Sequence, residues 1–483
     1  MTSTATRVLP APPAGPDGDI ARRWNESARA TAGVRMTGPA FERWFGAHRR
    51  EKRFEVNPIP FTDLRGWQFR PGTGDLGHES GRFFTIEGLR VDADWPYGGR
   101  WSQPIINQPE IGLLGILVKE FDGVLHCLMQ AKMEPGNTDT VQLSPSVQAT
   151  RSNYTGVHRG RPIPLLEYFM GPERGRVLID VLQSEQGSWF LRKRNRNMVV
   201  EVTGDVPDHP DFCWLTIGQI QELLRRDNVV NMDARTVLSC IPFTPDAARP
   251  NAAGDKTFQA ALCRSMDNSG PARHNIPHLL SWLTGLKTQW ELTQRTIPLD
   301  QVDHWRRTAG EIAHEDDRYF RVIAVEVAAH NREVGRWTQP LLAPVGQGRV
   351  AFLVRVFDGV LHVLIRAQIE AGTLNVAELG PTVSCNPDNY TWLPPDRRPP
   401  LLDFVRDLTP DALRYDAVQS EEGGRFHHAD NRYQIAQVGD NFPDDPGEDF
   451  RWMTMHQLND LLRHSNYINV QARTLIACLN TIW

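Results

Sequence analysis

Two stretches of the chain share one pattern of hydrophobic and polar positions. "FDGVLHCLMQAKMEPG" begins at Phe121 and "FDGVLHVLIRAQIEAG" begins at Phe357; ten of the sixteen paired positions are identical, at a separation of 236 residues. In each stretch an Asp-Gly pair lies between apolar runs rich in β-branched residues, which is a strong signal for a β-hairpin. The pattern therefore predicts the same hairpin twice, about half a chain apart.

The similarity between the two halves extends well beyond these hairpins. "GRWSQP" and "SNYT" in the first half return as "GRWTQP" and "DNYT" in the second, and "QSEQGSWF" at Gln183 returns as "QSEEGGRF" at Gln419. After two inserted residues, "NMDARTVLSC" at Asn231 matches "NVQARTLIAC" at Asn469. The two similar units are each about 200 residues long, which is too large for a solenoid repeat. The pattern therefore indicates a tandem domain duplication.

The remaining runs predict both strands and helices. "RFFTIEGLRV", "RVLIDVLQ", "SWFLRK" and "RNMVVEV" are typical of strands, whereas "PAFERWFGAHRR", "IPLLEYF" and "TIGQIQELLRR" are typical of helices. Thr216 with Gln219, and Thr454 with Gln457, form capping-box patterns at matching places in the two halves. Mixed antiparallel strands with flanking helices favour an α+β fold over a doubly wound parallel sheet.

These patterns predict a disordered tail over residues 1–20, a first domain over 21–250, a linker over 251–271 and a second domain over 272–483. Apolar residues make up 40% of the chain and charged residues 23%, as in ordinary globular proteins. The net charge of −5 is spread over the whole length, so nothing indicates a nucleic-acid partner or an acidic membrane surface.

Neither a membrane span nor a secretion signal is visible in the sequence. No apolar run approaches the roughly 18 residues of a spanning helix, and the first residues lack the charged start and apolar block of a signal peptide. The six cysteines show no CxxC spacing, which predicts reduced thiols in a cytoplasmic protein and no zinc site.

Common catalytic signatures are missing, and polar residues gather instead in the duplicated stretches. The sequence contains no GxGxxG after a strand, no phosphate-binding loop, no HExxH and no GxSxG. Glu185 comes just before four cations, Arg192, Lys193, Arg194 and Arg196. An alternating strand would direct the three arginines to one face and Lys193 and Asn195 to the other, although a solvated edge strand would show the same charges.

Aromatic residues are also matched between the halves. Trp101 corresponds to Trp337, and Tyr154 corresponds to Tyr390. Such residues usually pack in a core or an interface, but their place beside polar turns leaves room for stacking on a base or a sugar. His78 and His314 precede strands, where a structural role is the simpler interpretation.

Together these motifs resemble one family. "HESGRFF", "RWSQP", "SPSVQATRSNY", "LQSEQGSWF" and "QSEEGGRFHHADNRY" are similar to the NDP-hexose 2,3-dehydratases, which act in deoxysugar pathways of antibiotic-producing bacteria. The resemblance covers nearly the whole chain and implies two tandem Nudix-like α+β domains per subunit in a homodimer. The Nudix hydrolase box, with its metal-binding carboxylates, is missing from the sequence, which argues against metal-dependent cleavage of a pyrophosphate.

The resemblance also implies a substrate, dTDP-4-keto-6-deoxyglucose, and a reaction. The C4 ketone acidifies the hydrogen on C3, a base removes it, and hydroxide leaves from C2 with help from an acid. The enol product tautomerises to the 3,4-diketo-2,6-dideoxy sugar nucleotide. Nothing is oxidised overall, so we expect no cofactor and no metal ion in this step, and a downstream NADPH-dependent 3-ketoreductase as a pathway partner.

Each step of this reaction needs a particular kind of residue. The enolate oxygen needs hydrogen-bond donors, the proton transfers need groups of tuned pKa, the diphosphate needs Arg or Lys, and thymine needs an aromatic face. We expect Glu185 and Tyr154 of the first repeat to be catalytic, without separating base from acid. We expect the substrate to bind Trp101, Lys132, Arg151, Trp189, Arg192, Lys193, Arg194 and Asn195.

A second pocket is expected in the second repeat, formed by Trp337, Tyr390, Glu421, Arg425, His427 and Asn431. Five cations of the first repeat, at positions 132, 151, 192, 193 and 194, are replaced there by Gln368, Pro387, His428, Ala429 and Asp430. Arg366 and Arg425 restore only two, so we predict that the first pocket is catalytic and the second is a remnant or a structural nucleotide site. In the competing interpretation, Glu421, Glu422, His427 and His428 make the second pocket the chemically richer one.

Two further functions stay open from the sequence. One is another nucleotide-sugar enzyme, an isomerase or epimerase, which would use the same base and donors. The other is a non-catalytic scaffold that binds a nucleotide sugar, with the duplication serving assembly.

Overall fold

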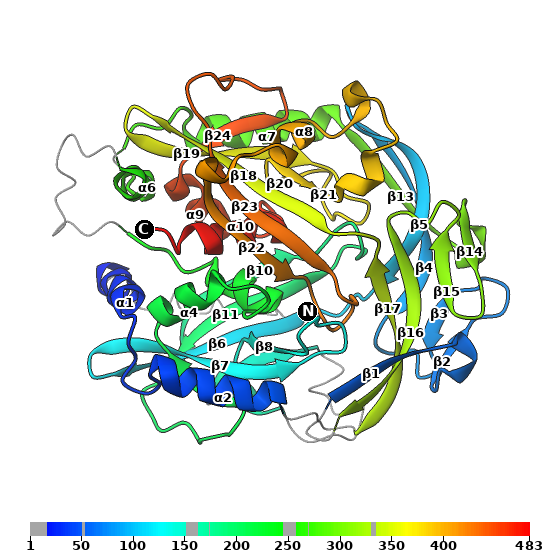
Figure 1. Cartoon of the computed structure of the whole chain (residues 1–483), viewed down its shortest axis with the longest axis horizontal. Coiled ribbons are helices and arrows are strands. Elements are labelled where there is room, and N and C mark those ends of the chain that lie inside the picture. Colours follow the sequence, from blue (N-terminus) through cyan, green and yellow to red (C-terminus); the bar gives the residue numbers. More distant parts are fainter. Residues whose placement is uncertain are drawn as a thin grey trace, which may run out of the picture.

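Two similar halves, each with one small and one large β-sheet, make up the computed structural model (Figure 1). The structure describes residues 17–50, 54–150, 163–172, 174–244, 257–268, 270–329 and 335–483. Helix α1 begins at Asp17, within the last residues of the predicted tail. Residues 251–256 and 269 of the predicted linker lie outside the described residues.

The regular elements follow the same order in both halves, except that α8 of the second half stands where the first half has a 3-10 helix. In the first half they are α1 (Asp17–Arg29), α2 (Gly38–Arg50), β1 (Phe54–Ile59), β2 (Trp67–Phe69), β3 (Leu76–His78), β4 (Thr85–Asp94), β5 (Gly99–Asn107), β6 (Gly112–Phe121), β7 (Val124–Met133), β8 (Val141–Ser144), β9 (Val147–Ala149), β10 (Arg176–Ser184), β11 (Arg194–Glu201), β12 (Phe212–Leu215), α4 (Ile217–Leu224) and α5 (Met232–Leu238). In the second half they are α6 (Phe258–Met266), α7 (Ile276–Gln289), β13 (Glu291–Ile297), β14 (Trp305–Arg307), β15 (Glu311–His314), β16 (Phe320–Ala329), β17 (Arg336–Pro344), β18 (Gly348–Phe357), β19 (Val360–Gln368), β20 (Glu378–Gly380), β21 (Val383–Cys385), α8 (Leu402–Arg406), β22 (Leu413–Ser420), β23 (Asp430–Gln437), β24 (Phe450–Met453), α9 (Met455–Leu462) and α10 (Val470–Leu479).

The large sheets confirm the α+β prediction. The first has the order β10-β11-β6-β7-β12, and the second repeats it as β22-β23-β18-β19 with β24 on β19. β11 runs parallel to β6, and β23 parallel to β18, while the other pairings are antiparallel. The predicted hairpins are confirmed, with positive φ at Asp122, Gly123, Asp358 and Gly359, as the tightest two-residue turns require.

The small sheets exchange their first strands between the halves. β1 of the first half pairs with β16 of the second half, and β13 of the second half pairs with β4 of the first half. The two exchanged strands lie at the right of Figure 1. The halves are therefore interlocked, because each one completes its small sheet with a strand of the other.

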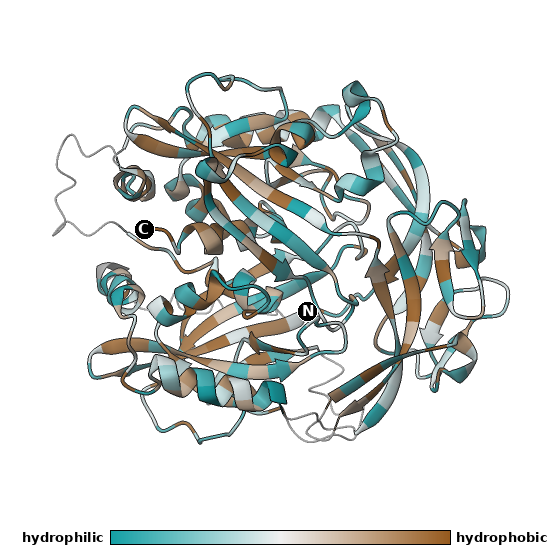
Figure 2. Ribbon diagram, viewed as in Figure 1, coloured by the Kyte–Doolittle hydropathy of each residue, from teal (hydrophilic) through white to brown (hydrophobic). Residues whose placement is uncertain are grey.

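The two large sheets are joined through helices that pack on one another. α5 lies against β6 and β11, α10 lies against β18 and β23, and the two helices contact each other. Figure 2 shows hydrophobic residues along the strands of both large sheets, and every position of β19 is buried. One hydrophobic core therefore continues through both halves.

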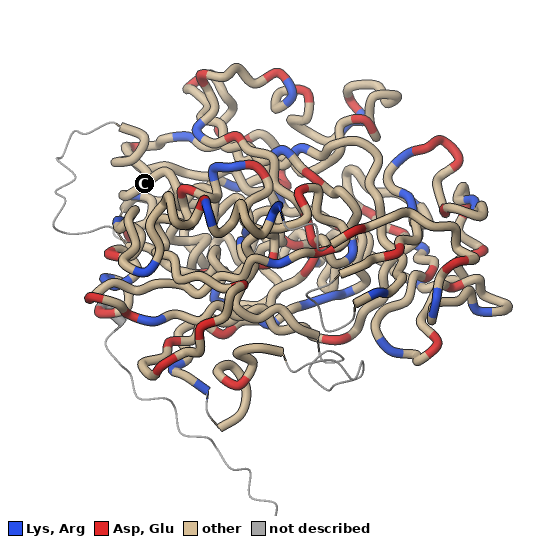
Figure 3. The backbone as a smooth tube through the Cα atoms, turned by 60° about the horizontal axis from the view of Figure 1, so that its bottom comes forward, with Lys and Arg blue, Asp and Glu red and all other residues tan. Residues whose placement is uncertain are grey.

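The charged residues that the structure describes show no large region of a single sign (Figure 3). Over the described part of the chain, lysines and arginines lie interspersed with aspartates and glutamates along the backbone (Figure 3). None of the described helices has the length and apolar character that a membrane crossing needs.

Three local predictions need correction. "SWFLRK" forms a turn instead of a strand, because Trp189 and Phe190 both donate backbone hydrogen bonds to Gln186 and Arg192 has a φ of 52°. Arg192 therefore does not share a strand face with Arg194 and Arg196. "IPLLEYF" contains only a short 3-10 helix, Leu166–Tyr168.

The third correction concerns the linker. Helix α6 lies within residues 251–271 and repeats α1: Ser265 Oγ accepts a 2.8 Å hydrogen bond from the N–H of Met455, as Ser27 Oγ accepts one of 2.9 Å from Ile217. The second repeat therefore begins before residue 272. The helix was not visible in the pattern because it is short and follows the connector directly.

Candidate active site

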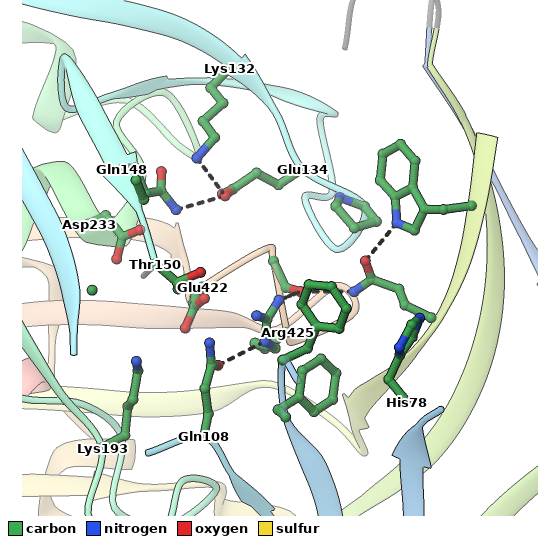
Figure 4. A pocket seen from close by; sticks show the side chains of 18 of the residues that line it. His78, Gln108, Lys132, Glu134, Gln148, Thr150, Lys193, Asp233, Glu422 and Arg425 are labelled. Atoms are coloured by element: carbon green, nitrogen blue, oxygen red, sulfur yellow. Dashed lines mark hydrogen bonds and ion pairs between the residues drawn. The ribbon is translucent and has the colours of Figure 1, made fainter. Parts of the chain in front are cut away.

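A cavity of about 530 Å³ lies between the first large sheet and elements of the second half (Figure 4). Its walls come from β2, β3, β6, β7, β9 and β11 of the first half, and from β17 and the turn between β22 and β23 of the second half. Both halves therefore contribute to one site.

The turn between β22 and β23 is held in the first half by backbone contacts. The N–H of Gly136 donates a 2.7 Å hydrogen bond to the carbonyl of Gly423, and the N–H of His428 donates one of 2.7 Å to the carbonyl of Gly136. A Cβ on Gly136 would lie 1.6 Å from the carbonyl oxygen of Phe426, so only glycine allows this close approach. The final glycine of the opening sequence pattern therefore serves to bring the two repeats together.

One end of the cavity is charged. The Nζ of Lys132, on β7, lies 3.4 Å from Oε1 of Glu134, which also accepts a 2.8 Å hydrogen bond from Nε2 of Gln148. Lys193, just before β11, donates to the carbonyl of Glu110. Burial lowers the pKa of Lys193, while the negative charges of nearby glutamates oppose this shift. This end offers donors and acceptors fixed by neighbours, as recognition of sugar hydroxyls and a ketone requires.

The other end is aromatic. The rings of Trp67 and Phe84 have centroids 4.8 Å apart, and so do the rings of His78 and Phe83. Trp337 on β17 also lines this part of the cavity. Flat aromatic faces of this kind suit a nucleobase.

A partly buried guanidinium, that of Arg425, lies between the two ends. Figure 4 shows it between His78 and the acidic group of the charged end. Its Cζ lies 4.4 Å from the ring centroid of Phe84, and its Nε donates a 3.1 Å hydrogen bond to Oε1 of Gln108. Burial lowers the pKa of Arg425, and the charge of Glu422 opposes this. An arginine in this setting is suited to bind an anionic group of a ligand.

Two carboxylates at the charged end come from different halves. Asp233, in the first turn of α5, is 3% exposed, and its Oδ1 has no hydrogen-bond partner among the described residues. Burial raises the pKa of Asp233 well above its ordinary value, and the charge of Glu422 adds to this. Burial also raises the pKa of Glu422, whereas Arg425 opposes the shift. The pair can therefore hold a proton at a pH where ordinary carboxyls are ionised.

Several of the residues singled out in the sequence come together in this cavity. They were assigned to two separate pockets, but the structure places them in one, because the turn of the second half lies against the first. The residues concerned are Lys132, Lys193, Asn195, Trp337 and Arg425.

Glu185 and Glu421 lie behind the cavity surface. Oε1 of Glu185 accepts a 2.8 Å hydrogen bond from Asn195, and its Oε2 has no partner among the described residues. Burial, with the nearby charge of Glu422, raises the pKa of Glu185 to about 7. Glu421 is fully engaged, because it accepts hydrogen bonds from Gln186, Asn431 and Tyr433 at 2.5, 2.6 and 2.6 Å.

The other predicted substrate contacts of the first repeat do not line the cavity. Trp101 is 36% exposed on β5, with its indole N–H donating to Gln103. Trp189 packs on Phe426, with ring centroids 4.5 Å apart. Arg192 donates to Gln294, and Arg194 lies at the start of β11 outside the lining.

The remaining predictions concern the second repeat and two residues beyond the described ranges. His427 stacks on His428 at 3.9 Å, and burial lowers its pKa to about 4. Tyr390 lies in a 3-10 helix, Pro387–Tyr390, where burial raises its pKa. Asn431 bonds Glu421, as described above. Arg151 and Tyr154 lie outside the described residues.

Sequence reasoning did not single out Asp233 or Glu134, and it favoured a structural role for His78. An acidic residue in the first turn of a helix is common, so Asp233 carries no local signal of function. The two repeats held one usable signal: Asp233 corresponds to Gln471, and Glu422 corresponds to Gln186. Each of these positions carries an acid in one repeat and an amide in the other, so the fold that the repeats share does not need the negative charge.

Within the described residues, no group of three or more His, Cys, Asp and Glu side chains is arranged to hold a metal ion. The charged end instead pairs its acids with lysines and with Arg425. Its residues suit proton transfer and anion binding.

The comparison with known proteins fits this geometry. The family model for NDP-hexose 2,3-dehydratase matches residues 39–241 and again residues 277–479. The chain is 52% identical over 463 residues to a dTDP-4-dehydro-6-deoxy-alpha-D-glucopyranose 2,3-dehydratase of Saccharopolyspora spinosa, covering 96% of this chain and 95% of that protein.

Two further proteins with the same enzyme name are similar. The protein from Amycolatopsis orientalis is 50% identical over 467 residues, covering 96% of this chain and 94% of its own length. That from Streptomyces violaceoruber is 50% identical over 454 residues, covering 93% and 98%. The chain belongs to the NDP-hexose 2,3-dehydratase family.

Proposed function

We propose that this protein is a dTDP-4-dehydro-6-deoxy-glucose 2,3-dehydratase, a hydro-lyase, and that the cavity between its halves is the active site. One observation carries the assignment to this cavity. Its aromatic end, the guanidinium of Arg425 and its acid-lined end follow one another in the order in which the substrate presents thymine, diphosphate and keto sugar.

The chemistry of the substrate matches the acid-lined end. Removing the C3 proton places charge on the C4 oxygen, which needs preorganised donors such as the amide of Gln148 and the ammonium groups of Lys132 and Lys193. The departure of the C2 hydroxyl needs an acid. No electrons leave the substrate, so the cavity needs no redox partner for this step.

The test is proton NMR of dTDP-4-keto-6-deoxyglucose incubated with the protein in D₂O. We expect loss of the signal of the proton on the hydroxyl-bearing C2 and appearance of a deuterated C2 methylene, both without added nicotinamide and after dialysis against a chelator. Exchange at C3 or C5 alone would identify an isomerase or epimerase, and an unchanged spectrum with tight binding would identify a scaffold. Either result would overturn the proposal.

The proposal extends to assembly and setting. The family resemblance supports Nudix-like repeats and a homodimer, which is the commonest symmetry of soluble oligomers. The six free cysteines are compatible with a cytoplasmic location, where thiols stay reduced. The reactive 3,4-diketo product requires a reductase to consume it, for which an NADPH-dependent 3-ketoreductase is the expected class. Light scattering that gives one 54.7 kDa chain at micromolar concentration would refute the dimer.

A further inference from the structure

The two carboxylates of the cavity, Asp233 and Glu422, have no acidic counterparts in the other repeat. Gln471 occupies the position equivalent to Asp233, and Gln186 the position equivalent to Glu422. The amide of Gln186 donates a hydrogen bond to Glu421, so in that repeat this position supports a neighbouring buried carboxylate. The backbone around these positions is shared between the repeats, so the acids are not needed for the fold itself.

The charged groups around Asp233 and Glu422 affect the ionisation of the two acids differently. Glu422 lies on the same turn as Arg425; burial raises its pKa, but the charges of Arg425, Lys193 and Lys132 favour its ionised form. Burial raises the pKa of Asp233 well above its ordinary value, the charges of Glu422, Glu185 and Glu134 add to this shift, and Lys132 opposes it. Pairs of titratable groups driven apart in this way are typical of an acid and a base that work together.

The buried oxygen of Asp233 points to a ligand. Oδ1 of Asp233 is inaccessible to solvent and has no hydrogen-bond partner among the described residues, although the side chain lines the cavity. Figure 4 shows the carboxyl groups of Asp233 and Glu422 on the same side of the cavity, with Thr150 between them. A sugar hydroxyl placed there would supply the missing partner.

We propose that Glu422 is the base that removes the C3 proton and that Asp233 is the acid that protonates the departing C2 hydroxyl. This assignment rests on the proposed function. It makes the active site a joint product of both repeats, with the acid on α5 of the first and the base on the β22–β23 turn of the second.

The step balances without a further reagent. The C3–H bond breaks, its proton goes to Glu422, and its electron pair forms the C4 enolate. The enolate electrons then form the C2–C3 double bond as the C2–O bond breaks, and the hydroxyl leaves as water with the proton of Asp233. Proton transfer from Glu422 to Asp233 restores both groups, and the enol product takes its C2 proton from water.

Two isosteric variants separate the roles. In D₂O, Glu422→Gln should lose both exchange of the C3 hydrogen and elimination, by about 10²–10⁴-fold. Asp233→Asn should lose elimination by a similar factor while C3 exchange continues, because its base is intact. Gln471→Asn, the matched change in the second repeat, should leave both rates unchanged.

A substrate analogue with fluorine at C2 provides a second measurement. Fluoride leaves without a strong acid, so Asp233→Asn should release fluoride at nearly the rate of the unmodified protein, whereas Glu422→Gln should not. This rescue also proves that Asp233→Asn is folded, and binding of dTDP by calorimetry checks Glu422→Gln.

Three results would overturn the assignment. They are C3 exchange that survives Glu422→Gln, C3 exchange that is lost in an Asp233→Asn protein that still binds dTDP, and no fluoride release by Asp233→Asn. Failure of the proposed function is distinct, because the unmodified protein would then not remove the C2 oxygen at all.

Discussion

The turns between β10 and β11 and between β22 and β23 have the same backbone plan and different chemistry. Each crosses to the other repeat: the N–H of Gly372 donates to the carbonyl of Gly187, just as Gly136 donates to Gly423. One turn presents Trp189, which packs on Phe426. The other presents a guanidinium at the equivalent position, and that group lies in the cavity.

The acids facing these turns differ in the same way. Glu370, equivalent to Glu134, accepts hydrogen bonds from the N–H of Gly187 at 3.2 Å and from the hydroxyl of Ser188 at 3.0 Å. Glu134 instead faces the cavity with Lys132 and Gln148. The contacts that hold each turn against the other repeat are present twice. The charges of Lys132, Asp233, Glu422 and Arg425, in contrast, have no charged counterpart at the equivalent positions.

The largest expected effect on activity comes from removing the positive charge of Arg425, the turn residue equivalent to Trp189. Arg425→Gln should lower kcat/KM by about 10²–10⁴-fold, because each hydrogen bond to a charged phosphate contributes roughly 1.5–3 kcal/mol. Steady-state kinetics and calorimetry with dTDP would measure the loss.

Trp189→Ala is the matched control for this change. It should leave dTDP affinity intact and reduce the free energy of unfolding by about 2–4 kcal/mol through lost packing. If Trp189→Ala weakens dTDP binding more than Arg425→Gln does, the nucleotide binds in the other repeat.

Sequence reasoning captured what is encoded locally. The Asp-Gly hairpins, the capping boxes at Thr216 and Thr454 and the α+β class follow from nearest neighbours along the chain, and the structure confirms them. The exchange of β1 and β13 was not predictable in this way, because the sequence pattern of a strand does not show which strand it pairs with.

The residues of the candidate active site were also predicted only as far as local sequence allows. Lys132, Lys193 and Arg425 were singled out as cations, but their meeting in one cavity depends on the crossing turn, which is a tertiary contact. Treating the repeats as separate domains divided one site into two. Asp233 was missed because its local pattern is that of any helix start.

A smaller effect is expected from the paired buried glutamates. Glu185→Gln should slow turnover by about tenfold, because Glu185 holds Asn195 and its charge acts on the cavity acids, without being one of the groups that move a proton. Glu421→Gln should leave turnover intact but cost about 1–3 kcal/mol of unfolding free energy, because an amide cannot accept from all three donors.

Turnover assays and urea unfolding of both variants check this pair. A Glu421→Gln protein without turnover, beside a fully active Glu185→Gln protein, would show that turnover depends on the buried glutamate of the second repeat. The prediction that Glu185 supports the reaction while Glu421 serves stability would then be wrong.

The smallest effect concerns stability and pH at Glu370. Burial raises the pKa of Glu370 to about 7 in the folded protein. Between its ordinary value near 4.5 and about 7, the unfolded chain releases this proton while the folded protein keeps it, so stability falls as the pH rises. Glu370→Gln removes this titration and should lessen the loss of unfolding free energy between pH 5 and pH 8 by about 1–3 kcal/mol. Urea unfolding at the two pH values measures it, and the other buried acids cancel because both proteins contain them. Equal pH slopes for the two proteins would mean that Glu370 is already ionised in the folded state, held by Gly187 and Ser188.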